Sequence, residues 1–174
     1  MSITGSMQVA LLTFLVVVVV MVFEAIISRR HEKVLRDTGA IEPAEDVYVL
    51  MQAVYPLSFV GMITEGGLFG VASYSWWMVG AAIFLTAKAL KFWAIASLGI
   101  RWTFRVLVPI NASFVQSGPY RWVLHPNYIA VIGELLGVAL MMKALVTGVI
   151  SIIGCGLLIA KRISVENRAL GRIR

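Results

Sequence analysis

A long apolar segment, "MQVALLTFLVVVVVMVFEAIIS" at residues 7–28, constrains this chain more than any other feature of its sequence. A membrane-spanning helix needs about 20 apolar residues, because its backbone polar groups must be satisfied inside the segment when lipid surrounds it. The segment is longer than the apolar core of a signal peptide, and no clear small-residue cleavage site follows it. We therefore expect it to form a first membrane span.

The rest of the chain has the composition of an integral membrane protein. Hydrophobic residues make up 60% of its 174 residues and charged residues 14%, whereas soluble domains average roughly 45–50% and 25%. Residues 1–174 are predicted to form one all-α domain, an integral membrane helical bundle. The last two spans are short and close together, so we expect them to form a tight helical hairpin. The five predicted spans cover residues 7–27, 47–69, 72–97, 128–143 and 146–163.

Basic residues are distributed unevenly over this predicted bundle. With five spans, fourteen of the 15 Lys and Arg residues fall on one side, including Lys88 and Lys91 at the end of the third span, and only Lys143 falls on the other. Cytoplasmic loops carry an excess of positive charge. The N-terminus is therefore predicted to lie outside and the C-terminus in the cytoplasm, across the inner or plasma membrane if the protein is bacterial. The net charge of +6 follows from this asymmetry and would attract the protein to anionic lipid.

One polar segment, "SGPYRWVLHPNYIA" at residues 117–130, interrupts the apolar second half of the chain. Pro119 and Pro126 prevent a continuous helix through it. The segment also carries Arg121 and His125, so it places chemically capable side chains at the predicted cytoplasmic face.

This segment and its surroundings resemble the isoprenylcysteine carboxyl methyltransferase family. The resemblance rests on "GPYRWVLHPNY" at 118–128, "LGIRWT" at 98–103, Glu134 in the next span and "RISVENRAL" at 162–170. It implies a membrane methyltransferase that uses S-adenosylmethionine and releases S-adenosylhomocysteine. It also implies a cofactor-binding catalytic half at residues 98–174, and we assign the lipid-substrate side to residues 1–97.

The family pattern implies a set of cofactor-contacting residues. The cofactor carboxylate calls for a cation or backbone N–H groups, which Arg121 and the turn at Gly118 offer, and its ammonium calls for a carboxylate, which Glu166 offers. His125 can form a hydrogen bond from either ring nitrogen. The full implied set is Gly118, Tyr120, Arg121, His125, Pro126, Tyr128 and Glu166.

The choice of catalytic residues depends on the acceptor, which we expect to be a lipophilic molecule. A prenylcysteine-like carboxylate is ionised at neutral pH and needs only a steering cation, for which the family pattern implies Arg172. A phenolic or polyketide lipid hydroxyl would benefit from a base, and Glu134 and His125 are available. Arg101 and Trp102 are the expected substrate contacts.

Glu134 is unusual because it lies inside a predicted span, where a carboxylate costs about 2.5–3.5 kcal/mol at mid-helix. An acid at such a position indicates either a functional group or a structural hydrogen bond, for which Arg101 and Trp102 are the expected partners. Glu24, by contrast, lies near the end of its span and is expected to reach the interface.

Simpler interpretations remain for several residues. Trp102, Trp122 and Tyr120 could form an interfacial aromatic belt, and Arg162 with Glu166 could be an exposed ion pair worth well under 1 kcal/mol.

Two positions depart from the family pattern: Asn167, where a second acid is usual, and Leu124, where a basic residue is frequent. These departures support one alternative, a non-catalytic membrane scaffold with a decayed site. A second alternative is phospholipid N-methylation, because phospholipid N-methyltransferases share the same pattern.

Other classes are disfavoured. No nucleic-acid module or basic groove with interleaved aromatic residues is visible. No metal site is expected, because His31 and His125 lie far apart in the sequence and there is one cysteine. That cysteine, Cys155, is expected to be a small buried hydrophobic residue. The oligomeric state does not follow from these patterns.

The charge asymmetry gives a first testable prediction. A reporter fused to the C-terminus should read as cytoplasmic, and one fused to the N-terminus should read as external. A C-terminal fusion that reports an external location would contradict the five-span orientation.

Overall fold

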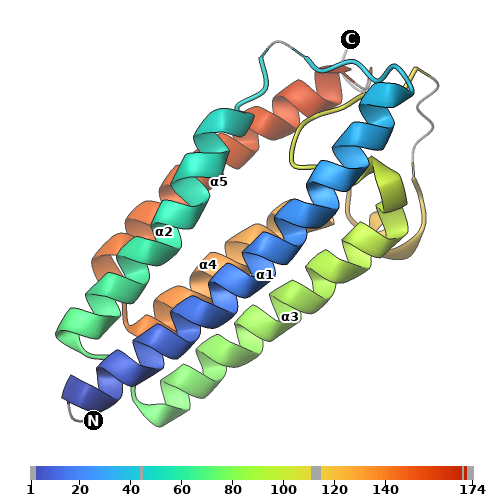
Figure 1. Cartoon of the computed structure of the whole chain (residues 1–174). Helices are drawn as coiled ribbons and strands as arrows, with labels where there is room; N and C mark the ends of the chain where they lie inside the picture. Colours follow the sequence, from blue (N-terminus) through green and yellow to red (C-terminus); the bar gives the residue numbers. More distant parts are fainter. Residues whose placement is uncertain (1–2, 44, 111–114, 170, 172–174) are drawn as a thin grey trace.

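The computed structural model describes residues 3–43, 45–110, 115–169 and 171, and these form a bundle of five α-helices (Figure 1). Two short 3-10 helices, η1 (Gly99–Arg101) and η2 (Gly118–Arg121), lie in the connector between α3 and α4. Extended pairing in the described ranges is limited to an isolated bridge between Ile41 and Val108, which joins the two long connectors. The helices are α1 (Ile3–Asp37), α2 (Tyr48–Phe69), α3 (Tyr74–Leu98), α4 (Pro126–Met142) and α5 (Leu145–Ala169).

The predicted all-α membrane bundle is confirmed. Three helical segments are long and apolar enough to cross a membrane, namely Gly5–Asp37, Tyr74–Arg101 and Leu145–Ala169, and α4 is a shorter apolar helix. Large apolar side chains such as Leu11 (64% exposed) and Leu157 (69% exposed) cover outward faces of the bundle, as a lipid environment requires.

Helix boundaries differ from the predicted spans where charged residues follow an apolar stretch. α1 continues past residue 27 to Asp37, because the Arg, Glu and Lys residues that follow are good helix formers. α5 likewise continues past residue 163, to Ala169. α4 begins at Pro126, since proline suits the first helical position, where no N–H is needed.

The α4–α5 hairpin is as tight as predicted. Lys143 ends α4 in the left-handed conformation, with φ 52°, and the N–H of Ala144 bonds the carbonyl oxygen of Ala139 at 2.9 Å. Glu65, near the end of α2, accepts hydrogen bonds from the N–H groups of Val146 (3.2 Å) and Thr147 (2.8 Å). These donors belong to the first turn of α5, so Glu65 satisfies groups that the helix itself leaves free.

Helices α3 and α4 approach each other at their backbones. An added Cβ at Gly137 would lie 2.8 Å from the carbonyl oxygen of Gly80 and 2.8 Å from the amide nitrogen of Phe84. Small residues allow such close helix contacts in membranes. On the same helix, Leu135 and Val138 are fully buried, so α4 forms the centre of the bundle.

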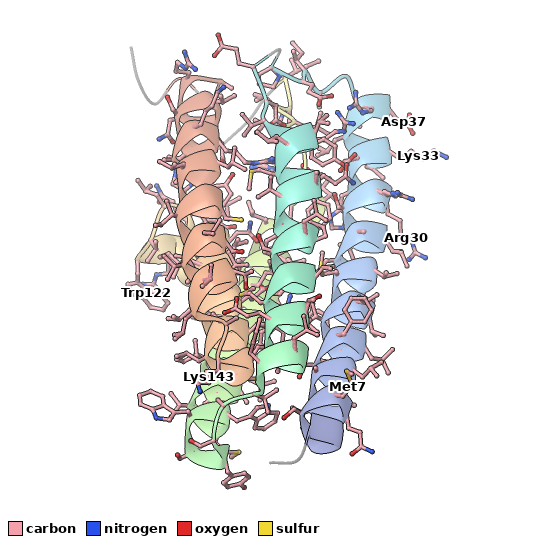
Figure 2. All side chains as sticks on the ribbon, turned by 90° about the vertical axis from the view of Figure 1, so that its left-hand side faces the viewer. Met7, Arg30, Lys33, Asp37, Trp122 and Lys143 are labelled. Atoms are coloured by element: carbon pink, nitrogen blue, oxygen red, sulfur yellow. The ribbon has the colours of Figure 1, made fainter. Side chains whose placement is uncertain are left out.

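Charge separates along the bundle axis. Lys33 lies near one end, beside Asp37, and Arg30 lies further down the same helix, whereas Lys143 lies toward the opposite end, at the level of Met7 (Figure 2). The structure corrects the charge count for Lys88 and Lys91, which are 6% and 2% exposed and lie inside the bundle. They pair with buried carboxylates and do not belong to the interfacial basic group. The side of the membrane on which each end lies stays a prediction.

The α3–α4 contact predicts a large difference between two glycine substitutions. Gly137→Ala should destabilise the protein by about 1–3 kcal/mol, because the added methyl group overpacks against the backbone of α3. Gly156→Ala is the matched control, since nothing lies within 4 Å of its added Cβ on α5. Thermal unfolding in detergent should show a lower midpoint for the first variant alone. Equal midpoints would contradict the close contact.

Candidate functional site

A cavity of about 600 Å³ lies between α1, α2, α3, α4, α5 and the connector that follows α3. This volume is within the range of roughly 300–1,000 Å³ that small-molecule sites occupy. Its polar wall includes Arg101, Tyr120, His125, Tyr128, Arg162 and Glu166. Its apolar wall, supplied by α1 and α2, includes Phe14, Val17, Val18, Met21, Phe59 and Val60.

The hydroxyl of Tyr128 joins α4 to α5 at this wall. It accepts a hydrogen bond from Nε of Arg162 at 2.9 Å and donates one to Oε2 of Glu166 at 3.0 Å. A hydroxyl has one proton to donate, and guanidinium can only donate. The direction of both bonds is therefore fixed, and the carboxylate of Glu166 is held in place.

His125 lies beside this pair. Its ring stacks on that of Tyr128, with centroids 5.6 Å apart, and its Nδ1 is 3.6 Å from Oε2 of Glu166. Nε2 of His125 is buried and has no hydrogen-bond partner within the described part of the chain. A buried polar atom without a partner is costly, so this nitrogen is available for a ligand.

Arg162 is anchored from three directions. Besides Tyr128, its guanidinium donates to the carbonyl oxygen of Phe104 and lies 3.4 Å from Oδ1 of Asp46. Its side chain is only 7% exposed. The interpretation of Arg162 and Glu166 as an exposed ion pair is therefore wrong, because both residues meet at Tyr128.

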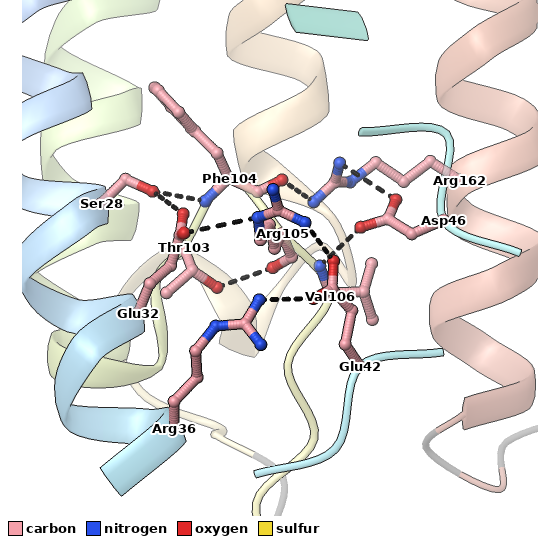
Figure 3. Close-up of polar contacts among 10 residues, drawn as sticks. All are labelled: Ser28, Glu32, Arg36, Glu42, Asp46, Thr103, Phe104, Arg105, Val106 and Arg162. Carbon is pink, nitrogen blue, oxygen red and sulfur yellow. Dashed lines mark hydrogen bonds and ion pairs between the residues drawn. The ribbon is translucent and has the colours of Figure 1, made fainter. Parts of the chain in front are cut away.

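A polar clasp ties the two connectors to α1 and α5 (Figure 3). The N–H of Phe104 donates to Ser28 at 2.8 Å, and Arg105 donates to Glu42 at 2.6 Å. Although burial alone would raise it, Arg105 and Arg36 hold the pKa of Glu42 below its ordinary value. The clasp comprises Ser28, Glu32, Arg36, Glu42, Asp46, Thr103, Phe104, Arg105, Val106 and Arg162.

Residues 103–106 of the clasp also line the cavity. The clasp therefore fixes a part of the wall that contains no regular secondary structure.

Trp102 is buried, at 3% exposure, so it does not belong to an interfacial aromatic belt. Its indole N–H donates to Oδ1 of Asn127 at 3.2 Å, and its carbonyl oxygen accepts a hydrogen bond from Nδ1 of His31 at 2.8 Å. These contacts fix its backbone and side chain to α1 and α4.

The short helix η2 brings Tyr120 to the cavity wall. Gly118 begins η2 with φ 57°, and an added Cβ there would lie 1.9 Å from Oγ of Ser97, so η2 packs directly on α3. Burial, and then the nearby carboxylate of Glu166, raise the pKa of Tyr120, so its hydroxyl stays protonated at neutral pH.

Four charged residues, which we call the four-charge cluster, meet inside the bundle: Glu24, Lys88, Lys91 and Glu134. Lys88 Nζ lies 2.7 Å from Glu24 Oε1 and 2.7 Å from Glu134 Oε2. Lys91 Nζ lies 2.9 Å from Glu24 Oε2 and 3.0 Å from Glu134 Oε1. Each lysine thus bridges both carboxylates, and the hydroxyl of Tyr55 also donates to Glu134.

The four-charge cluster corrects two expectations. Glu24 does not reach an interface, because it is 1% exposed. The partners of Glu134 are Lys88, Lys91 and Tyr55, and not Arg101 or Trp102.

The cavity wall contains a majority of the residues that the sequence singled out: Arg101, Trp102, Tyr120, His125, Tyr128 and Glu166. Gly118, Pro126, Arg121 and Glu134 are not part of that wall. Pro126 is buried at the start of α4, and Arg121 is exposed, with its guanidinium 5.8 Å from the ring centroid of Trp122. Arg172 lies outside the described residues. The functional roles of all these residues stay predictions.

Sequence reasoning missed several residues at the site. Asp46, Phe104, Tyr55, Glu24 and Lys91 all contact or line it, and none belongs to the recognised motifs. A signal existed for the four-charge cluster, since two acids and two lysines lie within apolar helices and such charges pair inside membranes. In the described residues, no group of three or more His, Cys, Asp and Glu side chains could hold a metal ion.

Comparison with known proteins identifies relatives of this chain. The sequence profile of the isoprenylcysteine carboxyl methyltransferase family matches residues 78–172. The uncharacterized protein YpbQ of Bacillus subtilis (strain 168) is 35% identical over 147 residues, covering 84% of this chain and 88% of the relative. An uncharacterized protein of Haemophilus influenzae is 29% identical over 167 residues, covering 93% of this chain and 95% of the relative.

No solved structure matches the chain. The family match spans more than half of the sequence and includes the motif residues at the cavity wall. The chain therefore belongs to the isoprenylcysteine carboxyl methyltransferase family, a family of membrane methyltransferases.

Proposed function

We propose that this chain transfers a methyl group from S-adenosylmethionine to an oxygen of a lipophilic acceptor at the membrane. The observation that carries the proposal is the mixed lining of the cavity. Tyr120, His125 and Glu166 share this cavity with apolar side chains from α1 and α2. Such a lining suits a polar cofactor and an acceptor with a hydrocarbon chain in one space.

The residues at the polar wall fit the chemistry of this cofactor. His125 offers a buried ring nitrogen without a partner in the described ranges. A hydrogen bond from a ligand would remove the energetic cost of leaving this nitrogen unsatisfied. Glu166 offers a carboxylate, which suits the cofactor ammonium. When bound, S-adenosylmethionine supplies a methyl group that its sulfonium has already activated, and S-adenosylhomocysteine is the product.

The chain itself supplies positioning. Arg162 and Tyr128 hold Glu166 through two hydrogen bonds of fixed direction. The polar clasp holds residues 103–106 against the cavity, which keeps that wall in one arrangement. Correct orientation of the reactants can lower a reaction barrier by about 7–11 kcal/mol. Because the cofactor is already activated, we propose that holding the reactants in position is the main catalytic contribution of the protein.

Acceptor binding is assigned to the residues on the other walls. Arg101 and Trp102 line the cavity and remain the proposed acceptor contacts. Glu134 is not among the lining residues but contacts Tyr55 and Lys91, which are, so in this proposal it positions those two side chains. Arg172 is the proposed steering cation if the acceptor is a carboxylate.

Two substitutions test the cofactor site. His125→Ala and Glu166→Ala should each weaken the binding of S-adenosylhomocysteine by about 1–3 kcal/mol, as expected when one partner of a buried or charged hydrogen bond is removed. Isothermal titration calorimetry in detergent measures this change. Glu45→Ala is the control, because it removes an exposed carboxylate that pairs with Arg168 at the surface.

If both variants bound S-adenosylhomocysteine with wild-type affinity, the assignment of the polar wall as the cofactor site would be wrong. If the wild-type protein failed to bind at millimolar ligand, a non-catalytic scaffold would be favoured. Lipid extracts incubated with the protein and labelled cofactor then distinguish O-methyl from N-methyl products.

Substitution of Arg172 reports on the acceptor. For a carboxylate acceptor, Arg172→Ala should raise KM or lower turnover without changing cofactor affinity, and Arg172→Lys should rescue only partly, because lysine lacks the planar fork that meets both oxygens. For a phenol or enol, lysine should serve nearly as well and the rate should rise with pH. Steady-state rates across pH distinguish these outcomes, and wild-type rates in both variants would exclude Arg172 from the site.

A further inference from the structure

The four-charge cluster is placed where it can also meet a ligand. Of its members, Glu24 and Lys91 line the cavity together with Tyr55, whereas Lys88 and Glu134 are not among the lining residues. Glu134 follows Tyr128 by six positions on α4, which is about 9 Å along the helix axis. The cavity therefore has a second polar region, deeper in the bundle than the wall formed by His125, Tyr128 and Glu166.

Lys91 has unused hydrogen-bonding capacity at this second region. Its ammonium has three N–H donors. Within the described residues, Oε2 of Glu24 accepts a hydrogen bond from it at 2.9 Å, and Oε1 of Glu134 lies 3.0 Å away as an ion-pair partner. Its Nζ also lies 5.4 Å from the ring centroid of Tyr55, a cation–π contact that uses no oxygen acceptor. A buried ammonium is poorly solvated, so a third acceptor in the cavity would be favourable.

The charge balance of the cluster indicates what kind of oxygen this acceptor should be. Two carboxylates and two ammonium groups neutralise one another in a closed arrangement. An added anion would introduce an unpaired charge in a buried environment and would approach Glu24 on the same wall. A neutral oxygen, such as a carbonyl, gains the hydrogen bond without that cost.

The surroundings of Lys91 indicate the rest of the ligand. Val17, Met21 and Phe59 line the same cavity and supply only hydrocarbon contacts. A ligand that fills this region is therefore apolar except at the point that meets Lys91.

We propose that Lys91 is a specificity-determining residue that donates a hydrogen bond to a neutral oxygen of the methyl acceptor, at a position separate from the oxygen that is methylated. The inference rests on the proposed function, because it takes this cavity as the acceptor site. It adds a chemical requirement: the acceptor carries a second, uncharged oxygen beside its hydrocarbon chain.

The test compares two ligands that differ at one group. Para-palmitoylphenol and para-hexadecylphenol share a phenol and a chain of equal length, and a carbonyl in the first replaces a methylene in the second. The para carbonyl makes the first phenol more acidic, so binding is measured in weakly acidic buffer, where both phenols are protonated. The full-length protein in detergent should bind the carbonyl ligand more tightly by about tenfold, the order expected for one hydrogen bond from a charged donor. Binding is followed by the fluorescence of the tryptophan residues, of which Trp102 lines the cavity.

Two charge-balanced double variants separate Lys91 from the cluster as a whole. Lys91→Met with Glu24→Gln removes one charge of each sign and the cavity-facing ammonium. Lys88→Met with Glu24→Gln removes the same charges but leaves Lys91 in place. The carbonyl preference should disappear in the first and persist in the second. Each ligand partitions into detergent to the same extent in every sample, so the change in the carbonyl preference from one protein to another is independent of partitioning.

Equal preference in the two double variants, or no preference in the wild-type protein, would overturn the proposal. Far-UV circular dichroism and gel filtration confirm that each variant is folded. A measurement on the wild-type protein alone covers the case in which a variant does not fold. The infrared carbonyl stretch of isotope-labelled para-palmitoylphenol should move to lower frequency on binding, and an unshifted stretch would overturn the proposal.

These outcomes are separable from failure of the proposed function. Binding of S-adenosylhomocysteine by the wild-type protein is measured in the same samples. If the wild-type protein did not bind S-adenosylhomocysteine, the proposed methyl transfer would be refuted. The carbonyl preference tests the hydrogen bond from Lys91 whether or not the protein turns over.

Discussion

A charged side chain at the centre of a membrane-spanning helix costs about 2.5–3.5 kcal/mol, and this chain brings Glu24, Lys88, Lys91 and Glu134 together inside its bundle. The cost is offset only when every charge has a partner. Because Glu24 is on α1, the lysines are on α3 and Glu134 is on α4, the pairing sets the register of three helices at once. Removal of one member would leave an unpaired buried charge, which is far more destabilising than loss of an exposed pair. The wall that α1 contributes to the cavity depends on this register.

Much of the fold could be predicted because its causes are local. The length of each apolar segment predicts the spans, and Pro126 marks the start of α4. The short segment at Lys143 predicts the hairpin of α4 and α5. Local reasoning fails where the partner is distant in sequence. Lys88 and Lys91 lie near the end of their predicted span, so a one-dimensional reading assigns them to the interface. Only the facing carboxylates of α1 and α4 show that they are buried.

The candidate site divides in the same way. Tyr120, His125, Tyr128 and Glu166 belong to recognisable motifs, and all four share one cavity. Arg162 was visible as a neighbour of Glu166 on α5, but its contacts with Phe104 and Asp46 depend on how two connectors fold back on the bundle. The apolar wall from α1 and α2 carries no motif at all, since many hydrophobic sequences would form it equally well.

The hydrogen bonds that Glu65 accepts, together with the tight turn at Lys143, limit the direction in which the cavity extends. They close the end of the bundle where α4 meets α5, and the residues that line the cavity do not include any from that end. Within the described residues, the lining of the cavity therefore stops short of this turn. In the proposed function, an acceptor that enters the cavity would leave through the same region of the bundle, so the proposed reaction modifies the acceptor in place and is not coupled to transport across the membrane.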